Sequence, residues 1–436
     1  MDVHAPLAGV HRADAAIVGG GLTGLLTADF LSGEGLRTAL VTDGLPACPG
    51  PLIVSLQQPE AFRRIAAHHG QEALREHVGR LRRVLRALPG WLEPLAPFRE
   101  AEVYAYARMP QEVPLLEMQR ALLKGLRIGA QIAPDAGGCP FPVTLSMRSP
   151  ALLIDSQRLA ESLVRRIAAA GGRVFTGSRV VNASASAVFT AEGRVDAPLV
   201  LLCTGKPLGL CGRRLLALLE TRTTAHCRLT PPVPLHTVQT AVLPGGLALL
   251  PSGGVVHAAW DAWRTGTREE ALRSAYFRRI LHSRLPDWQA EPPDHRLQVR
   301  TADGLPMVGG LPAEGGQVLF ASGAEDFPTA VLAAQALARL ALHRPTPADL
   351  LLRPDRPLPR RAVRQALRRL RRHRVVNALR TGAPRCSHCA CRLRFFEAAR
   401  WWGCPCCGSA YGVLGSRVGG PTLADAEISA AQRPGW

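Results

Sequence analysis

The chain has 436 residues, of which 47% are hydrophobic and 20% charged. This composition excludes a mostly disordered chain, and the length exceeds what one hydrophobic core ordinarily supports, so we expect two or three domains. No run of eighteen apolar residues occurs, which predicts that no helix spans a membrane. The first residues lack the charged and apolar regions of a secretory signal, so we expect a cytoplasmic protein.

The net charge of +19 is unevenly distributed along the chain. Residues 353–385 hold twelve arginines and a single acid, Asp355. A segment of this kind can attract nucleic acid or another acidic partner. Val363, Leu367 and Leu370 follow helical spacing, however, so we favour a basic helical linker over 351–384 that docks on a neighbouring domain. Nucleic acid is therefore not the expected partner.

Regular elements can be assigned from the hydrophobic pattern, and their order predicts an α/β fold. An apolar strand over 14–19, a helix that ends at Gly33–Gly35 and a strand over 37–42 form a βαβ unit. A helix over 60–93, a second βαβ unit over 154–175 and a strand over 196–205 follow. Alternating strands are predicted over 216–262, with a hairpin at PGGLALLPSGG. A buried strand over 317–323 and a helix over 329–343 come next.

The loop between the first strand and the first helix carries a GxGxxG pattern. It consists of Gly19, Gly20, Gly21, Leu22, Thr23 and Gly24. In this setting the first glycine permits a tight turn, the second lets the backbone approach a pyrophosphate, and the third allows the helix to pack on the strand. The acid that usually binds the ribose is replaced by Thr42, followed by Asp43. The loop therefore predicts dinucleotide binding without separating FAD from NAD.

Later motifs resemble the FAD-dependent oxidoreductases related to D-amino acid oxidase. Thr301–Gly309 (TADGLPMVG), Val318–Gly323 with the helix after it, and the strand Asp196–Gly205 occur in the order found in that family. The resemblance covers residues 14–345 and implies FAD as cofactor. It also implies that the last strand–helix turn lies near the flavin ring. Further cofactor contacts are then expected at Thr204, Gly205, Gly323 and Asp326.

The same resemblance implies a discontinuous Rossmann-like FAD-binding domain and an α+β substrate domain. We place the first at 1–75, 145–215 and 296–350 and the second at 76–144 and 216–295. Two stretches depart from the family pattern. The turn after the last strand has an acid and a proline where the family has glycines, and residues 45–53 lack the polar stretch that often touches the cofactor.

Six of the eleven cysteines lie between Cys386 and Cys407. With their neighbours they resemble the Rieske iron–sulfur motif, which implies a [2Fe–2S] cluster in a module over 385–436. By position Cys386, His388, Cys404 and Cys407 are then the ligands, and Cys391 and Cys406 match a pair that can form a disulfide. A thiolate in place of the second histidine predicts a lower reduction potential. The spacing also fits a four-cysteine zinc ribbon in which Cys389 replaces His388.

Two functions remain open from the sequence. The first is an enzyme that uses FAD to oxidise a C–N or C–O bond of a small-molecule substrate. Electrons would pass between the flavin and the cluster, and a redox protein is a further candidate partner. The second is a regulatory protein with an eroded FAD site and a structural zinc ribbon. No catalytic acid or base stands out. His68, His69 and Glu72 lie on a helix whose pattern predicts that they face solvent.

Overall fold

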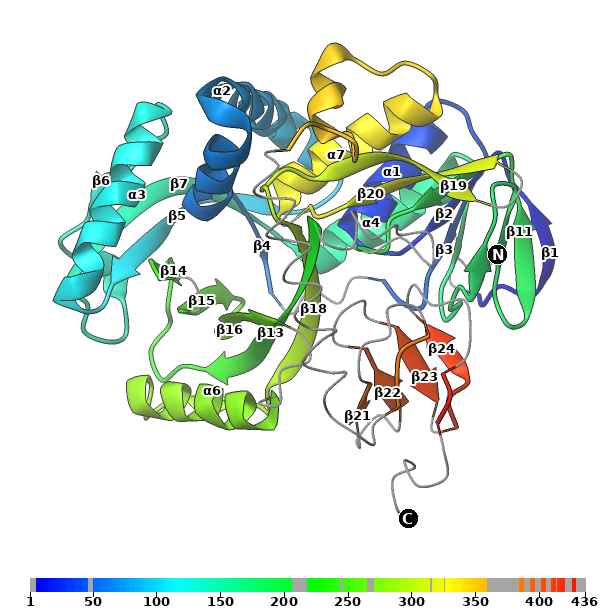
Figure 1. Cartoon of the computed structure of the whole chain (residues 1–436). Helices are drawn as coiled ribbons and strands as arrows, with labels where there is room; N and C mark the ends of the chain where they lie inside the picture. Colours follow the sequence, from blue (N-terminus) through cyan, green and yellow to red (C-terminus); the bar gives the residue numbers. More distant parts are fainter. Residues whose placement is uncertain are drawn as a thin grey trace.

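The computed structural model describes residues 5–45, 50–205, 218–243, 246–264, 270–313, 316–324, 326–358 and, near the C-terminus, 384–387, 393–396, 401–404, 409–412, 414–419 and 426–428. Two sheets organise this part of the chain, with helices around them and a small β module at the C-terminal end (Figure 1).

The first sheet has six strands in the order β19-β20-β12-β2-β3-β8, which agrees with the expected α/β fold. All neighbouring strands of this sheet pair in parallel except β19 and β20, which are antiparallel. The strands are β2 (Ala15–Val18), β3 (Thr38–Val41), β8 (Arg173–Phe175), β12 (Leu199–Leu202), β19 (Met307–Ala313) and β20 (Gly316–Ser322).

Three helices cover one face of this sheet: α1 (Leu22–Gly33), α4 (Ser156–Ala169) and α7 (Phe327–Ala341). Helix α1 contacts both α4 and α7, so it is surrounded by protein and buries polar residues as well as leucines. Its buried Asp29 is paired with Arg166 of α4, Oδ1 to Nε at 3.0 Å. The sequence predicted these helices and every strand of the sheet except β19, because each is a local apolar run that ends at glycine or a polar turn.

A smaller sheet, β1-β11-β10-β9, lies near the other face and shares its apolar cluster. Its strands are β1 (Gly9–Arg12), β9 (Asn182–Ala183), β10 (Ala187–Phe189) and β11 (Gly193–Asp196). Val188 and Val195 are fully buried in that cluster. The α-helical layer and this β layer thus enclose the parallel sheet from both sides.

The second large sheet is mostly antiparallel and has ten strands. They are β4 (Leu52–Ser55), β5 (Phe98–Ala107), β6 (Gln131–Ile132), β7 (Leu145–Ile154), β13 (Leu219–Thr230), β14 (Val238–Ala241), β15 (Leu247–Ser252), β16 (Val255–Arg264), β17 (Gln289–Ala290) and β18 (Asp294–Thr301). The predicted hairpin is the β15–β16 turn. Strands β4 and β7 belong here although the predicted ranges assign them to the other domain, because strand pairing between distant segments leaves no local signal in the sequence.

Helices α2 (Pro59–Leu92) and α3 (Val113–Gly125) share the main core with one end of this sheet, while α6 (Glu270–Arg284) packs on the opposite face. Helix α2 is interrupted at Gly70, whose φ is +86°. Short 3₁₀ helices occupy Pro110–Glu112, Ala136–Gly138 and Pro347–Leu352. No helix of the described residues is long and apolar enough to cross a membrane.

The C-terminal module contains a four-stranded antiparallel sheet of β21 (Arg394–Phe396), β22 (Trp401–Gly403), β23 (Ala410–Gly412) and β24 (Arg417–Gly419). Its buried Leu393, Trp402 and Tyr411 belong to the same apolar cluster as Met307 and Phe320 of the six-stranded sheet. The module therefore shares a core with the rest of the chain (Figure 1).

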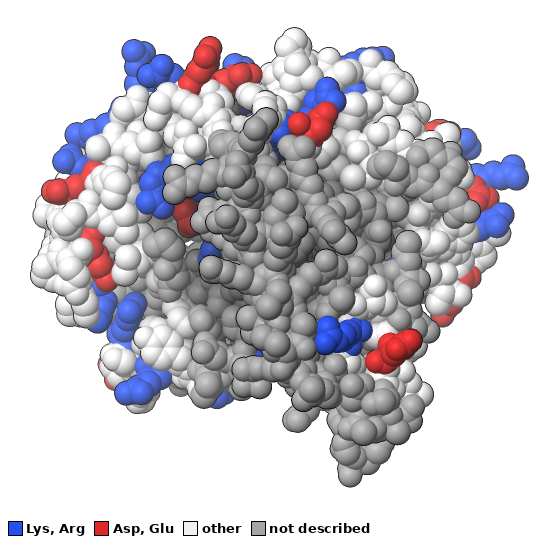
Figure 2. All heavy atoms as spheres, in the orientation of Figure 1, with Lys and Arg blue, Asp and Glu red and all other residues white. Residues whose placement is uncertain are grey.

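The start of the predicted helical linker is not helical. The last 3₁₀ turn ends at Leu352, and residues 353–358 continue without helix. Pro354 and Pro357 explain the difference, because proline removes a backbone donor and restricts the residue before it. Residues 359–383, with most of the arginine run, lie outside the described residues. On the described part of the face in Figure 2, basic and acidic side chains are intermixed.

Candidate functional site: the glycine loop, the cavity and the C-terminal module

The glycine loop closes tightly between β2, α1 and β12. Gly19 has a φ of +110°, and a Cβ there would lie 2.6 Å from the carbonyl oxygen of Cys203. A Cβ on Gly24 would overlap the carbonyl oxygen of Gly19. The first and last glycines of the motif are therefore required by backbone packing, whatever the loop binds.

Gly21 differs from its neighbours, because a Cβ there would have nothing within 4 Å. It is the N-cap of α1, no side chain caps this helix end, and its first turn contains no acid. The N–H groups of Leu22 and Thr23 have no acceptor inside the helix. Open space beside an uncapped helix N-terminus fits a pyrophosphate, so the residues present fit the phosphate end of FAD.

The two residues at the end of β3 are held by other parts of the protein. The Thr42 hydroxyl accepts from the Gly20 N–H at 3.0 Å and donates to the Gly44 carbonyl at 2.7 Å. The Asp43 carboxylate is exposed and paired with Arg179, Oδ2 to Nη2 at 2.9 Å. Thr42 therefore closes the glycine loop, and Asp43 has the chemistry that a ribose hydroxyl would need.

Two further turns lie at the carboxyl ends of neighbouring strands, β12 and β20. Gly205 has a φ of +73°, and the Ser322 hydroxyl donates to its carbonyl. A Cβ on Gly323 would lie 2.5 Å from Thr301 Cγ2 of β18, which excludes a larger residue there. Thr204 begins the first of these turns. The glycine loop follows β2 of the same sheet. The glycine loop and the two turns therefore lie together at the carboxyl ends of the parallel strands, where such folds bind ligands.

Beneath these turns lies the Cys203 thiol, which is fully enclosed. Burial raises its pKa to about 12, although a hydrogen bond with Thr27 opposes the shift. The thiol is thus protonated at neutral pH and serves as packing rather than as a nucleophile.

Asp326 caps helix α7 and faces the second large sheet. Its Oδ1 accepts from the Thr329 N–H at 2.9 Å and from the Thr329 hydroxyl at 2.8 Å. Burial raises its pKa, while hydrogen bonds from Thr329 and Gln58 act in the opposite direction. The acid that stands where the family has glycine is therefore explained by helix capping.

Asp326 also lines a cavity of about 460 Å³, which we call the reaction cavity. Its walls come from β4, β5, β14, helix α3 and the starts of α2 and α7. Ile53, Val103 and Val242 supply apolar surface, and the buried Oε1 of Gln57 has no hydrogen-bond partner among the described residues. The volume suits a small molecule, and the unpaired amide oxygen suits a ligand N–H or O–H.

The aspartate of the TADGLP motif is the centre of a buried ionic cluster. Arg356 contacts both Asp303 oxygens, at 2.7 and 2.8 Å, and the His69 ring nitrogen lies 2.8 Å from Oδ2. Although burial alone would raise the pKa of Asp303, His69 and Arg356 hold it well below its usual value. The prediction that His69 faces solvent is wrong, because its side chain is only 7% exposed. The helical pattern of α2 carries no information about Asp303, which lies 234 residues away in the sequence.

Two of the predicted metal ligands, Cys386 and Cys404, are described and buried in the C-terminal module. Cys386 Sγ lies 3.0 Å from the Tyr411 hydroxyl, and the Cys404 N–H donates to the Ser409 carbonyl at 2.7 Å. His388, Cys389 and Cys407, and with them the Cys391–Cys406 pair, lie outside the described residues. The described residues alone contain no group of three metal-binding side chains.

Solved structures share this architecture. Glycine oxidase from Geobacillus kaustophilus superposes with a TM-score of 0.63 at 19% identity, covering 80% of this chain and 100% of its own. L-proline dehydrogenase from P. horikoshii gives 0.57 at 14% identity, with 79% and 98% covered. L-amino acid deaminase from Proteus myxofaciens gives 0.54 at 13% identity, with 80% and 94% covered. At these identities the likeness establishes the fold.

Comparison with curated proteins gives no sequence match. The family model for FAD dependent oxidoreductases (DAO) matches residues 14–340, which is most of the chain and includes both large sheets. The chain therefore belongs to the DAO family of FAD-dependent oxidoreductases.

Proposed function

We propose that this enzyme uses FAD to oxidise a C–N bond of a small amine or amino acid in the reaction cavity. The observation that carries the proposal is the position of this cavity, which borders the last strand–helix turn at Asp326. The solved neighbours named above are an oxidase, a dehydrogenase and a deaminase of glycine, proline and other amino acids, and so favour C–N over C–O chemistry.

FAD, when bound, would accept the two electrons released when the C–H beside the nitrogen is broken. The chain would hold its pyrophosphate at Gly21, Leu22 and Thr23 and its ribose at Asp43. Gly205 and Gly323 would let backbone approach the rest of the cofactor. Gln57 Oε1 would accept an N–H of the substrate, which fixes the orientation of the reacting carbon.

The test is anaerobic reduction of the purified, flavin-loaded protein. We expect glycine or L-proline to bleach the flavin absorbance, whereas glycolate, the alcohol counterpart of glycine, should not. The Gln57→Leu variant should keep its flavin and bleach more slowly, while Gln119→Leu on the same cavity wall serves as control. Bleaching by glycolate but by no amine would contradict C–N chemistry.

We further propose that the C-terminal module binds a [2Fe–2S] centre through Cys386, His388, Cys404 and Cys407 and exchanges electrons with the flavin. Two buried cysteines in one small module, one beside a buried tyrosine hydroxyl, support a site that holds thiolates. Both ligand sets require deprotonated sulfur, so loss of a true ligand should release the metal.

The comparison of His388→Ala with Cys389→Ala separates this centre from a zinc ribbon. Iron, zinc, sulfide and visible absorbance are measured on protein purified without air. An iron–sulfur centre predicts metal loss in His388→Ala alone. Metal loss in Cys389→Ala, with zinc retained in His388→Ala, would instead establish the ribbon and remove the electron-transfer role.

A further inference from the structure

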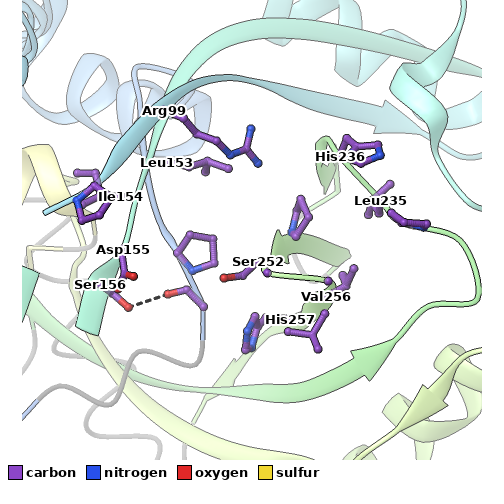
Figure 3. Close-up of a pocket in the computed structure, with 18 of the residues that line it drawn as sticks. Arg99, Leu153, Ile154, Asp155, Ser156, Leu235, His236, Ser252, Val256 and His257 are labelled. Atoms are coloured by element: carbon purple, nitrogen blue, oxygen red, sulfur yellow. Dashed lines mark hydrogen bonds between the residues drawn. The ribbon is translucent and has the colours of Figure 1, made fainter. Parts of the chain in front are cut away.

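A second hollow, of about 590 Å³, opens on the ten-stranded sheet beside Gly50 and Pro51, which precede β4. Its lining residues are all different from those of the reaction cavity. We call it the Arg99 hollow (Figure 3). Its walls are formed by the starts of β5 and α4, the end of β7, the β15–β16 turn and the loop before β14.

Strand register places a cation in this hollow. Arg99 of β5 pairs with Leu153 of β7, which pairs in turn with Ile53 of β4. The three side chains therefore share one sheet face. The Arg99 guanidinium extends into the hollow, and His236 and His257 lie across it (Figure 3). Within the described part of the chain, no acidic side chain pairs with Arg99.

The remaining polar groups leave this charge uncompensated. Asp155 is the one acid among the described lining residues. It caps the N-terminus of α4 and is paired with Arg158, Oδ2 to Nε at 3.6 Å. The Ser156 hydroxyl donates to the Gly50 carbonyl at 2.9 Å. Burial lowers the pKa of His257, with Arg228 acting in the same direction, so this imidazole is neutral at neutral pH. Arg99 is therefore the permanent cation of the lining, and no acid of the described residues is paired with it.

Part of the remaining wall is apolar and stiff. Leu153, Ile154, Leu235 and Val256 line the hollow together with several prolines. The fixed φ of proline limits the movement of such loops. A planar guanidinium matches the two oxygens of a carboxylate, and one positive charge balances one negative charge. The ligand that fits is a monocarboxylate with an apolar body.

We propose that the Arg99 hollow is a second binding site, which takes a small apolar monocarboxylate away from the reaction cavity. The proposal does not depend on the C–N chemistry, since it rests on charge and shape at a separate set of residues.

Isothermal titration of the full-length protein tests the site with cyclohexanecarboxylate as the probe. Its neutral counterpart, cyclohexanecarboxamide, and inorganic phosphate are the comparison ligands. We expect the carboxylate to bind and the carboxamide to bind at least about tenfold more weakly, because a lost charge-assisted pair costs 1.4 kcal/mol or more, a factor of about ten. Phosphate keeps the charge but has no apolar body, so it should also bind more weakly than the carboxylate.

Substitutions test whether the carboxylate binds in the Arg99 hollow. Arg99→Gln should weaken carboxylate binding about tenfold or more, whereas Arg86→Gln, an exposed arginine on α2, should leave it unchanged. Ser252→Phe, which fills the hollow, should also abolish binding. Ala105→Phe, which fills the reaction cavity, should leave it intact. The proposal is overturned if Ala105→Phe removes binding while the protein keeps its melting temperature, or if Arg99→Gln and Ser252→Phe both retain binding. Neither result bears on flavin reduction by amines.

Discussion

Arg356 joins the segment that follows α7 to the TADGLP motif, and its replacement by methionine should be strongly destabilising. The side chain is only 3% exposed. It donates to both oxygens of Asp303 and to carbonyl oxygens of Leu305 and Pro306, at distances between 2.7 and 3.1 Å. Methionine fills similar volume but offers none of these donors.

The size of the stability loss follows from the state of Asp303 once Arg356 is removed. Asp303 is also buried, so without Arg356 its negative charge would keep, within the described part of the chain, His69 as its partner. Removing one member of a buried ion pair costs about 3–5 kcal/mol, because the remaining charge is neither solvated nor paired. Arg356→Lys should also destabilise, since an ammonium cannot reach both carboxylate oxygens and the carbonyls together.

Urea unfolding followed by tryptophan fluorescence measures this loss as a shift of the midpoint. Arg86→Met, at an exposed position of α2, is the matched control and should change the unfolding free energy by less than about 0.5 kcal/mol. In the cycle with Asp303→Asn, the double variant should be more stable than the sum of the single losses implies. A loss below about 1 kcal/mol for Arg356→Met would refute the reasoning from burial.

Three further outcomes are expected. Gly24→Ala should lower the melting temperature, because the added Cβ meets backbone atoms. Gly21→Val should leave the melting temperature of the flavin-free protein unchanged and abolish flavin retention. A Gly21→Val protein with full flavin content would exclude the dinucleotide site. Burial acts to raise the pKa of Asp349, but Arg339 and Thr346 outweigh it and hold the value at about 2, below the usual 3.8. Its contribution to stability is therefore complete above pH 4 and lost as the pH falls toward 2, and Asp349→Asn should show a flatter acid limb in urea titrations between these values. Tyr411→Phe removes the hydroxyl beside the Cys386 sulfur and should shift the visible spectrum or the reduction potential of any metal centre there. An unchanged spectrum and potential would show that this hydroxyl does not influence the metal.

The elements that the sequence predicted are those built from local patterns. The βαβ unit over 14–42, helix α4, strand β20 and helix α7 each show an apolar run bounded by glycine or a polar cap, and each is found within a few residues of its predicted position. The glycine spacing also fixed the loop geometry, because only glycine tolerates the φ of Gly19 and the close approach at Gly24.

Other features depend on residues that meet only in the folded chain. Strands β4 and β7 join the ten-stranded sheet through partners far away in sequence. Thr42 turns toward the glycine loop, and its neighbour Asp43 pairs with Arg179. The Arg99 hollow needs five separate segments before its charge and walls exist. Periodicity records which face of an element is apolar, but it carries no information about which distant side chain will neutralise, cap or fill the space beside it.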